Sequence, residues 1–218
     1  MRLNFITLGL LIVLTVLGLS LIRTSLLKNA QDTGTALTQI YAAEGESNLT
    51  IYETLLSFGS SSISDRLSNG TPREDLAAWL DLYFQRVESV LGKGIVDPYA
   101  VLDGKILAAN PWEGDASYDI AGSEWYQKAI QADGRVIFTN VYTDAISQRP
   151  VITAAQQCGN SDAVLAFDIF PENFQFQFDS LERLSGNSFF LCDSTGAIIY
   201  QQTASEQTPE VVQHYLRD

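Results

Sequence analysis

The chain has 218 residues, 46% of them hydrophobic and 18% charged, so it is long enough to bury at least one packed core. Its formal net charge of −13 argues against a nucleic-acid partner, because contacts with a phosphate backbone need clustered lysine and arginine. The cysteines, Cys158 and Cys192, and the single histidine, His214, have no zinc-site spacing, and no glycine-rich loop suits a phosphate. We therefore expect no metal and no cofactor, and a Ser-His or Cys-His nucleophile is disfavoured because it would have to use His214. The cysteines can pair outside the cytoplasm, but two separate buried thiols are the favoured interpretation.

The first element is an uncharged apolar run of 18 residues, Phe5–Ile22. As a helix it would extend about 27 Å, close to the roughly 30 Å of a bilayer core. The small residues in Gly18-Leu19-Ser20 also fit a cleaved signal peptide, but the apolar run continues past that site. We favour an uncleaved signal anchor over residues 1–24, in the inner or plasma membrane, with the acidic remainder outside the cytoplasm.

Residues 25–70 have the apolar spacing of a long helix, although their heptads are not clean and glycines 34, 45 and 59 weaken the pattern. This segment can be a helix that simply continues from the membrane span. It can also be a signalling stalk, in which case we expect a homodimer that forms through the long helix.

A globular region is expected to begin at Thr71-Pro72-Arg73-Glu74, where a capping threonine, a proline for the first helical position and a capping-box glutamate agree. Apolar residues continue at helical spacing as far as Val90, and Gly92 ends the predicted helix. The dipeptide Asp103-Gly104 between two apolar runs predicts a tight hairpin. Further along, Ser123 can cap a second helix.

Three more strand candidates follow, at Arg135–Asn140, Pro150–Gln157 and Ala163–Ile169. A long helix followed by about five antiparallel strands with helical crossovers is an α+β arrangement. The hairpin pattern returns about 90 residues later, at Phe189–Tyr200, which suggests a second copy of the same lobe. We expect residues 187–218 to be an incomplete second lobe, either truncated or vestigial.

Aromatic and acidic residues recur in three segments of the globular region. They are Tyr118 with Trp125-Tyr126, then Tyr142 and Asp144 in VYTDA, then Asp168 in VLAFDIF. With the order of anchor, long helix and lobe, the chain resembles, over roughly Ser25–Tyr200, the double Cache family of extracytoplasmic sensor domains. The resemblance implies a membrane-distal, PAS-like ligand-binding lobe over residues 71–186 that is not an enzyme. It also implies a receptor whose output domain, of chemoreceptor, histidine kinase or diguanylate cyclase type, lies outside this chain.

In the amino-acid-binding branch of that family, aromatic residues and aspartates at these places hold the ligand's ammonium group. An arginine two residues before the tryptophan holds its carboxylate; here that position is Ser123, which cannot bind a carboxylate bidentately. Because carboxylates and aromatic faces attract cations, we hypothesise a small amine ligand. Arg149 could instead replace the missing arginine and restore amino-acid binding. The predicted ligand-binding residues are Tyr118, Ser123, Trp125, Tyr126, Tyr142, Asp144 and Asp168.

Each of these residues also has a structural interpretation. Trp125 and Tyr126 are successive and point about 100° apart on a helix, so either can belong to the core. Asp144 suits a turn, whereas Asp168 interrupts an apolar run, where an uncompensated carboxylate is costly. Two other functions remain open: an anchored protein-interaction domain with a filled or apolar cavity, and a hydrolase that uses Asp144 and Asp168 as paired carboxylates.

Overall fold

The structure, a computed structural model, describes residues 2–170 and 189–202. The chain divides into two compact units, Met1–Leu49 and Thr50–Asp218. The predicted anchor and stalk are one helix, α1 (Arg2–Ser68), which makes up the described part of the first unit and continues into the second. Among the described residues, α1 is the one helix long and apolar enough to cross a membrane, and none of that apolar window is buried.

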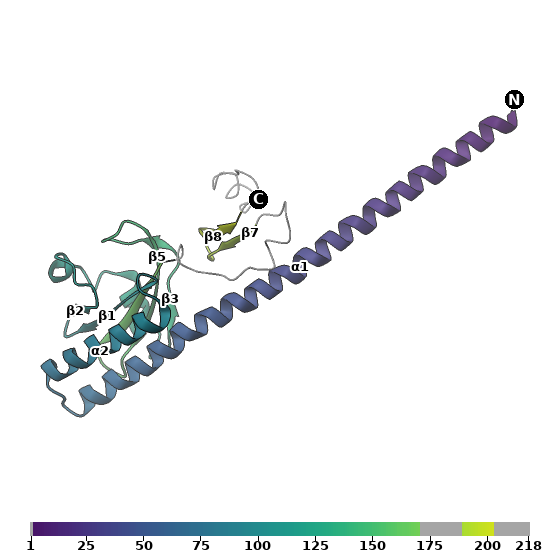
Figure 1. Cartoon of the computed structure of the whole chain (residues 1–218). Helices are drawn as coiled ribbons and strands as arrows, with labels where there is room; N and C mark the ends of the chain where they lie inside the picture. The colour runs from purple at the N-terminus through teal and green to yellow at the C-terminus, as the bar shows by residue number, and fades with distance from the viewer. Residues whose placement is uncertain (1, 171–188, 203–218) are drawn as a thin grey trace. The chain divides into compact units, whose positions relative to one another are not determined.

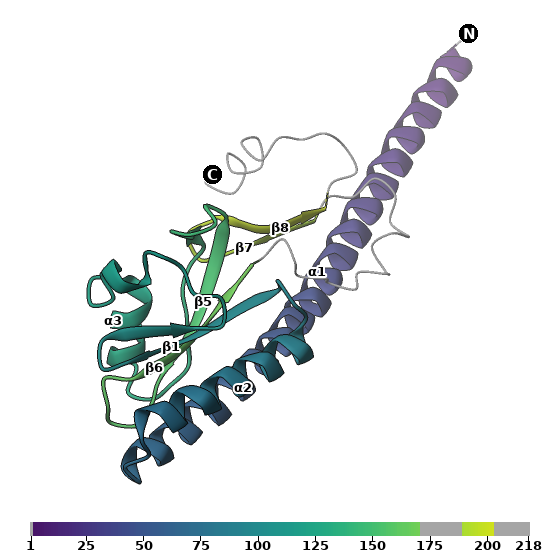
Figure 2. The same ribbon diagram turned by 60° about the vertical axis from the view of Figure 1, so that its left-hand side comes forward.

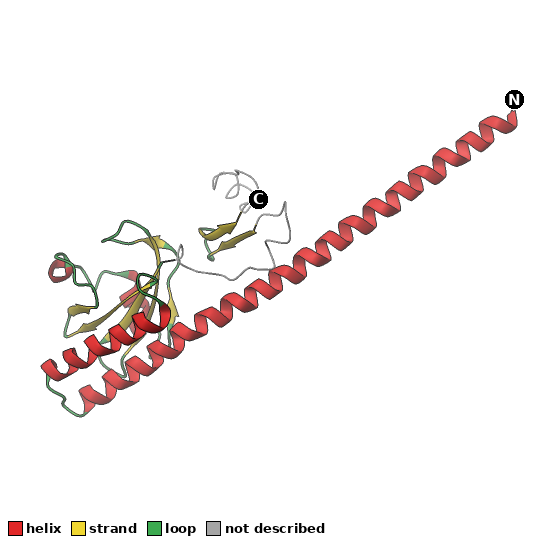
Figure 3. Ribbon diagram, in the orientation of Figure 1, coloured by secondary structure: helices red, strands yellow, loops and turns green. Residues whose placement is uncertain are grey.

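The second unit is built on an antiparallel sheet with the strand order β2-β1-β6-β5-β3, in which β4 also pairs with β5 (Figure 1, Figure 3). Its strands are β1 (Val96–Leu102), β2 (Lys105–Ala108), β3 (Ile137–Phe138), β4 (Tyr142–Thr143), β5 (Pro150–Gln157) and β6 (Val164–Ile169). Asp103 and Gly104, between β1 and β2, have positive φ angles of 49° and 70°, as a two-residue hairpin turn requires. The predicted hairpin and the α+β arrangement are confirmed.

Helix α2 (Arg73–Leu91) and the last turns of α1 pack together along one face of this sheet (Figure 2). The Tyr83 hydroxyl of α2 donates a hydrogen bond of 2.6 Å to the Leu55 carbonyl of α1. A Cβ added to Gly59 of α1 would lie 2.5 Å from the Leu165 side chain of β6, so this glycine allows the helix to approach the sheet closely. The core on this face includes Leu56, Ile63, Leu76, Leu80, Val87, Val96, Leu165 and Phe167.

Two details of α2 differ from the prediction. The helix begins at Arg73, and Pro72 is the N-cap residue without a side-chain cap, so the predicted cap by Thr71 is wrong. The reason is that Pro72 has an extended ψ of 143° and therefore precedes the helix. Val90, expected on the buried face, is 61% exposed, while Gly92 ends the helix as predicted.

The opposite face carries α3 (Glu124–Gln131), with Ser123 at its N-cap position as predicted. Trp125 and Ala129 of α3 are buried against the sheet. The cluster they join comprises Tyr99, Val101, Ile120, Ala155, Val164 and Ala166. A loop that contains a short 3₁₀ helix, η1 (Asp115–Ser117), connects β2 to α3. This loop and α3 define where the functional site can lie.

The second predicted hairpin is also present, as β7 (Phe189–Cys192) and β8 (Ile198–Gln202). The remainder of the expected second lobe, including an amphipathic segment predicted at residues 209–216, lies outside the described residues. Cys158 and Cys192 are both free thiols, as the favoured interpretation has it, but only Cys158 is buried; Cys192 is half-buried.

Candidate functional site

Strand pairing places two carboxylates and a threonine in one row on the α3 side of the sheet. Asp97 of β1 lies opposite Asp168 of β6, which in turn lies opposite Thr153 of β5. Side chains of directly opposed residues project from the same face of a sheet, with Cβ atoms about 5 Å apart. Like charges in that position repel each other, so the Asp97–Asp168 pair is unfavourable unless a proton or a cation compensates it.

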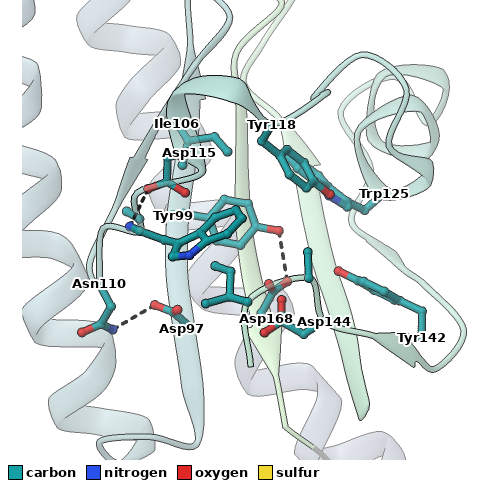
Figure 4. A pocket seen from close by; sticks show the side chains of 14 residues that line it. Asp97, Tyr99, Ile106, Asn110, Asp115, Tyr118, Trp125, Tyr142, Asp144 and Asp168 are labelled. Carbon is teal, nitrogen blue, oxygen red and sulfur yellow. Dashed lines mark hydrogen bonds between the residues drawn. The ribbon is translucent and has the colours of Figure 1, made fainter. Parts of the chain in front are cut away.

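This row lies in a small cleft with a volume of about 50 Å³ (Figure 4). Pockets for drug-sized ligands hold roughly 300–1,000 Å³, so the cleft suits a ligand of a few heavy atoms. Its walls come from β1, β2, β4, β6, α3 and the loops after β2 and β4. The lining residues are Asp97, Tyr99, Ile106, Ala108, Asn110, Trp112, Asp115, Tyr118, Trp125, Tyr142, Asp144, Ala145, Ile146 and Asp168.

A chain of hydroxyl groups fixes the carboxylate of Asp168. Tyr99 donates a hydrogen bond of 3.0 Å to Oδ1 of Asp168, and Thr153 donates one of 2.6 Å to the same atom. Since the Thr153 hydrogen is used in this way, Tyr142 donates the 2.6 Å bond that joins its hydroxyl to Oγ1 of Thr153. Both hydrogen bonds that Asp168 accepts end on Oδ1, so Oδ2 is left for a ligand among the described groups.

Burial raises the pKa of Asp168 from its usual 3.8 to about 7, against the lowering effect of the hydrogen bonds from Thr153 and Tyr99. The negative charges of Asp144 and Asp97 raise it further. Burial also raises the pKa of Asp97, although Asn110 donates a hydrogen bond of 2.9 Å to it. Neighbouring acidic side chains therefore add to the raised pKa values of Asp97 and Asp168, as expected for a site that takes up positive charge.

Asp144 lines the cleft and also stabilises the turn after β4. It is buried, with 7% of its surface exposed, and its Oδ2 accepts a 2.6 Å hydrogen bond from the backbone N–H of Ser147. Arg149, at the end of the same turn, does not line the cleft; its guanidinium lies 4.4 Å from the centre of the Phe170 ring. Arg149 is thus not in position to bind a ligand's carboxylate in this conformation.

Five of the seven predicted residues lie around the cleft: Tyr118, Trp125, Tyr142, Asp144 and Asp168. Ser123 and Tyr126 do not. The Ser123 hydroxyl donates to the Ile120 carbonyl at 2.7 Å, which is a local bond at the start of α3. The Tyr126 hydroxyl donates to the Asp162 carbonyl at 2.9 Å and does not reach the cleft.

A model of methyl-accepting chemotaxis protein-like first PDC sensor domains matches residues 63–170, the segment that contains the sheet, α2, α3 and the cleft. Residues 63–170 are therefore similar to this sensor-domain family. The match confirms the resemblance to Cache-type sensors and the expectation of a sensing module rather than an enzyme. In sequence, 72 residues are 31% identical to the methyl-accepting chemotaxis protein TlpB of Bacillus subtilis, over 33% of this chain and 11% of that protein. The chain therefore spans only about a tenth of this relative.

Solved chemoreceptor domains share the fold. The ligand-binding domain of Campylobacter jejuni Tlp3, solved in complex with L-valine, superposes with a TM-score of 0.64 at 19% identity, over 88% of this chain and 82% of that domain. The ligand-binding domain of Pseudomonas fluorescens CtaA, solved with L-alanine, gives 0.54 at 17% identity, over 74% and 67% of the two chains. At this identity the likeness establishes the fold of the sensor domain alone.

Sequence reasoning missed several cleft residues of this PDC sensor domain: Asp97, Tyr99, Asn110, Trp112 and Asp115. A usable signal existed for Asp97, which interrupts an apolar strand in VDPYAVL just as Asp168 does in VLAFDIF. Asn110, Trp112 and Asp115 lie in the loop after β2, where no periodic pattern indicates the direction of a side chain.

Proposed function

We propose that this chain is the sensing part of a membrane-anchored bacterial receptor and that its cleft binds a small amine as the ammonium cation. The observation that carries the proposal is the charge of the cleft. Four aspartates line it, Asp97, Asp115, Asp144 and Asp168, and none of its described lining residues is lysine, arginine or histidine. An ammonium group would compensate the Asp97–Asp168 pair, whereas an anionic group would meet no basic side chain.

The aromatic residues of the cleft support the same ligand class. Tyrosine and tryptophan faces attract cations, and Tyr99, Trp112, Tyr118, Trp125 and Tyr142 all border the acidic row. Burial raises the pKa values of Tyr99 and Tyr142, so both stay protonated and act as hydrogen-bond donors near Asp168. A filled apolar cavity, which the interaction-domain alternative requires, is not supported by a lining that includes four aspartates.

A second candidate ligand is an amino acid, which the solved complexes of Tlp3 and CtaA with L-valine and L-alanine favour. It would need a donor for the carboxylate group. Arg149, five residues after Asp144, is the basic residue considered for this role. The turn 144–149 would have to rearrange to move its guanidinium away from the Phe170 ring.

On this proposal, α1 crosses the membrane, the second unit lies outside the cytoplasm and the long helix mediates a homodimer. Those three features rest on the apolar stretch of α1 and on the receptor family. The output domain of such a receptor would lie beyond this chain.

Isothermal titration of the purified full chain in detergent tests the ligand class. Methylammonium, a diamine such as putrescine, L-alanine and L-valine are titrated into wild type, Asp168→Asn and the matched control Asp162→Asn, whose side chain is exposed. Amine binding that Asp168→Asn abolishes and Asp162→Asn retains supports the proposal. Binding of amino acids alone, lost in Arg149→Ala, would replace it with the second candidate.

A further inference from the structure

Trp112 and Trp125, the two tryptophans of the cleft, differ strongly in exposure. Trp112 lines the acidic cleft, yet 40% of its surface is exposed to solvent. Trp125, the other tryptophan of the cleft, is only 3% exposed and packs edge-on against Tyr99, with ring centres 5.3 Å apart. The Trp125 Nε1–H also points to the Tyr118 hydroxyl at 3.4 Å. The indole with surface left for a ligand is therefore Trp112, not Trp125.

Gly114 holds this indole in place by having no side chain. A Cβ built on Gly114 would overlap the six-membered ring of Trp112. The backbone of Gly114 does not need a glycine, since its φ of −79° and ψ of −11° are ordinary right-handed helical values. The glycine is thus required for the position of the ring, not for the conformation of the loop.

The loop around the ring is itself closed by hydrogen bonds. Oδ2 of Asp115 accepts a 2.9 Å bond from the backbone N–H of Trp112, and the Asp115 N–H returns one of 3.1 Å to the Trp112 carbonyl. Ser117 adds a backbone bond of 2.9 Å to the Gly114 carbonyl. This compact turn gives the indole a defined support beside the carboxylates.

We propose that Trp112 contacts the bound ligand and sets the size of the ammonium group that the cleft accepts, with Gly114 as the residue that positions the indole. This inference rests on the proposed amine-binding function. The π face of Trp112 would contact the N-alkyl groups of the cation while Asp97 and Asp168 compensate its charge. Substituents larger than the gap between indole and carboxylates would be excluded.

The test uses methylammonium, trimethylammonium and tetramethylammonium chlorides, which carry one charge each and differ in size. Affinities are measured by isothermal titration at pH 8 for wild type, Trp112→Ala, Gly114→Ala, the double variant and the control Gly34→Ala. In the control, the new Cβ meets nothing within 4 Å. Loss of a cation–π contact predicts that Trp112→Ala weakens the best-bound probe by about 2- to 30-fold and reduces discrimination by size. Gly114→Ala should change the relative affinities for the three probes in the same direction as Trp112→Ala does.

The double variant separates positioning from general loop damage. If Gly114 acts through the indole, the double variant binds all three probes like Trp112→Ala; a further loss would overturn that role. Suppose that wild type binds the probes and Asp168→Asn does not. Unchanged affinities in both Trp112→Ala and Gly114→Ala would then refute the role of Trp112 and leave the amine site intact. Absence of binding by wild type would instead refute the proposed function, and with it this inference.

Discussion

Replacing Asp168 by asparagine should stabilise the ligand-free protein while it removes the charge that we propose to bind a cation. The amide oxygen of asparagine can still accept the hydrogen bonds that Tyr99 and Thr153 donate to Oδ1. The substitution therefore removes the negative charge opposite Asp97 without removing the acceptor of the hydroxyl chain.

The size of the effect follows from the pKa of Asp168. Its value of about 7 in the folded protein, against 3.8 ordinarily, is mainly the result of burial. Because the folded pKa is the higher one, the cost of ionisation is absent below about pH 3.8, grows as the pH rises and is complete above about pH 7. The rise of the pKa of Asp168 from 3.8 to about 7 corresponds to an ionisation cost of at most about 4 kcal/mol. The substitution removes this cost, but an asparagine N–H₂ group without a hydrogen-bond partner costs roughly 1–3 kcal/mol. The free energy of unfolding should therefore rise by roughly 1–3 kcal/mol at pH 8.

Thermal unfolding followed by tryptophan emission measures this gain. All three tryptophans, Trp79, Trp112 and Trp125, lie in the second unit, so their signal reports on the sensor domain rather than on the first unit. We expect Asp168→Asn to raise the midpoint by about 2–12 °C at pH 8. At pH 4.5 ionisation of the wild-type carboxyl costs only about 1 kcal/mol, so the variant should show no gain there or a small loss. Asp162→Asn, an equal change of charge at an exposed position, should stay within about 0.5 kcal/mol of wild type. A destabilised Asp168→Asn variant at pH 8, or a gain that does not depend on pH, would refute the reasoning.

Three further predictions concern ligand binding and packing. Because a cation and a proton compete for Asp168, methylammonium affinity should be about tenfold weaker at pH 6 than at pH 8 in isothermal titration. The control Asp162→Asn, at an exposed position outside the cleft, should retain that dependence, and a flat profile in wild type would contradict the competition. Arg149→Ala, which removes the guanidinium from the Phe170 ring, should leave amine affinity within about twofold, and a larger loss would place Arg149 in the site. Gly59→Ala should lower stability by about 1–3 kcal/mol in thermal unfolding because its Cβ would meet Leu165 and Tyr83, whereas Gly34→Ala should not; equal effects would contradict the close approach of α1 to the sheet.

Much of the fold could be predicted because its signals are local. The positive φ angles at Asp103 and Gly104 follow from the residue types themselves, and Ser123 precedes α3 as its side chain suggests. Short strands were harder. Of the predicted strand at residues 135–140, only Ile137–Phe138 is paired, and the two-residue strand β4 gave no recognisable period.

The candidate site was harder still, because it depends on register. In the sequence Asp168 is visible as a charge in an apolar run, but its role depends on Asp97, which lies 71 positions earlier and directly opposite it in the sheet. Pairing between strands so far apart in sequence is decided by the whole sheet, and no local pattern contains it. For the same reason the sequence could not separate Trp125, packed in the core, from Trp112, exposed at the cleft.

Residues other than Ser123 support the proposed amine ligand. Ser123, in place of an arginine, first suggested a ligand without a carboxylate, but its hydroxyl bonds to Ile120 at the start of α3 and it does not line the cleft. The face of the sheet supplies a better reason. On this face of β1, Val101 and Tyr99 belong to the apolar cluster and Asp97 lies in the cleft. On the same face of β6, Val164 and Ala166 belong to the cluster and Asp168 lies in the cleft. Both strands change from apolar to acidic at the same register position, because Asp97 lies opposite Asp168. One end of this face is therefore covered by α3, and the other end is acidic without a basic side chain among the described lining residues. On the proposed function, a bound cationic ligand would explain why such a costly pair is kept beside a packed core.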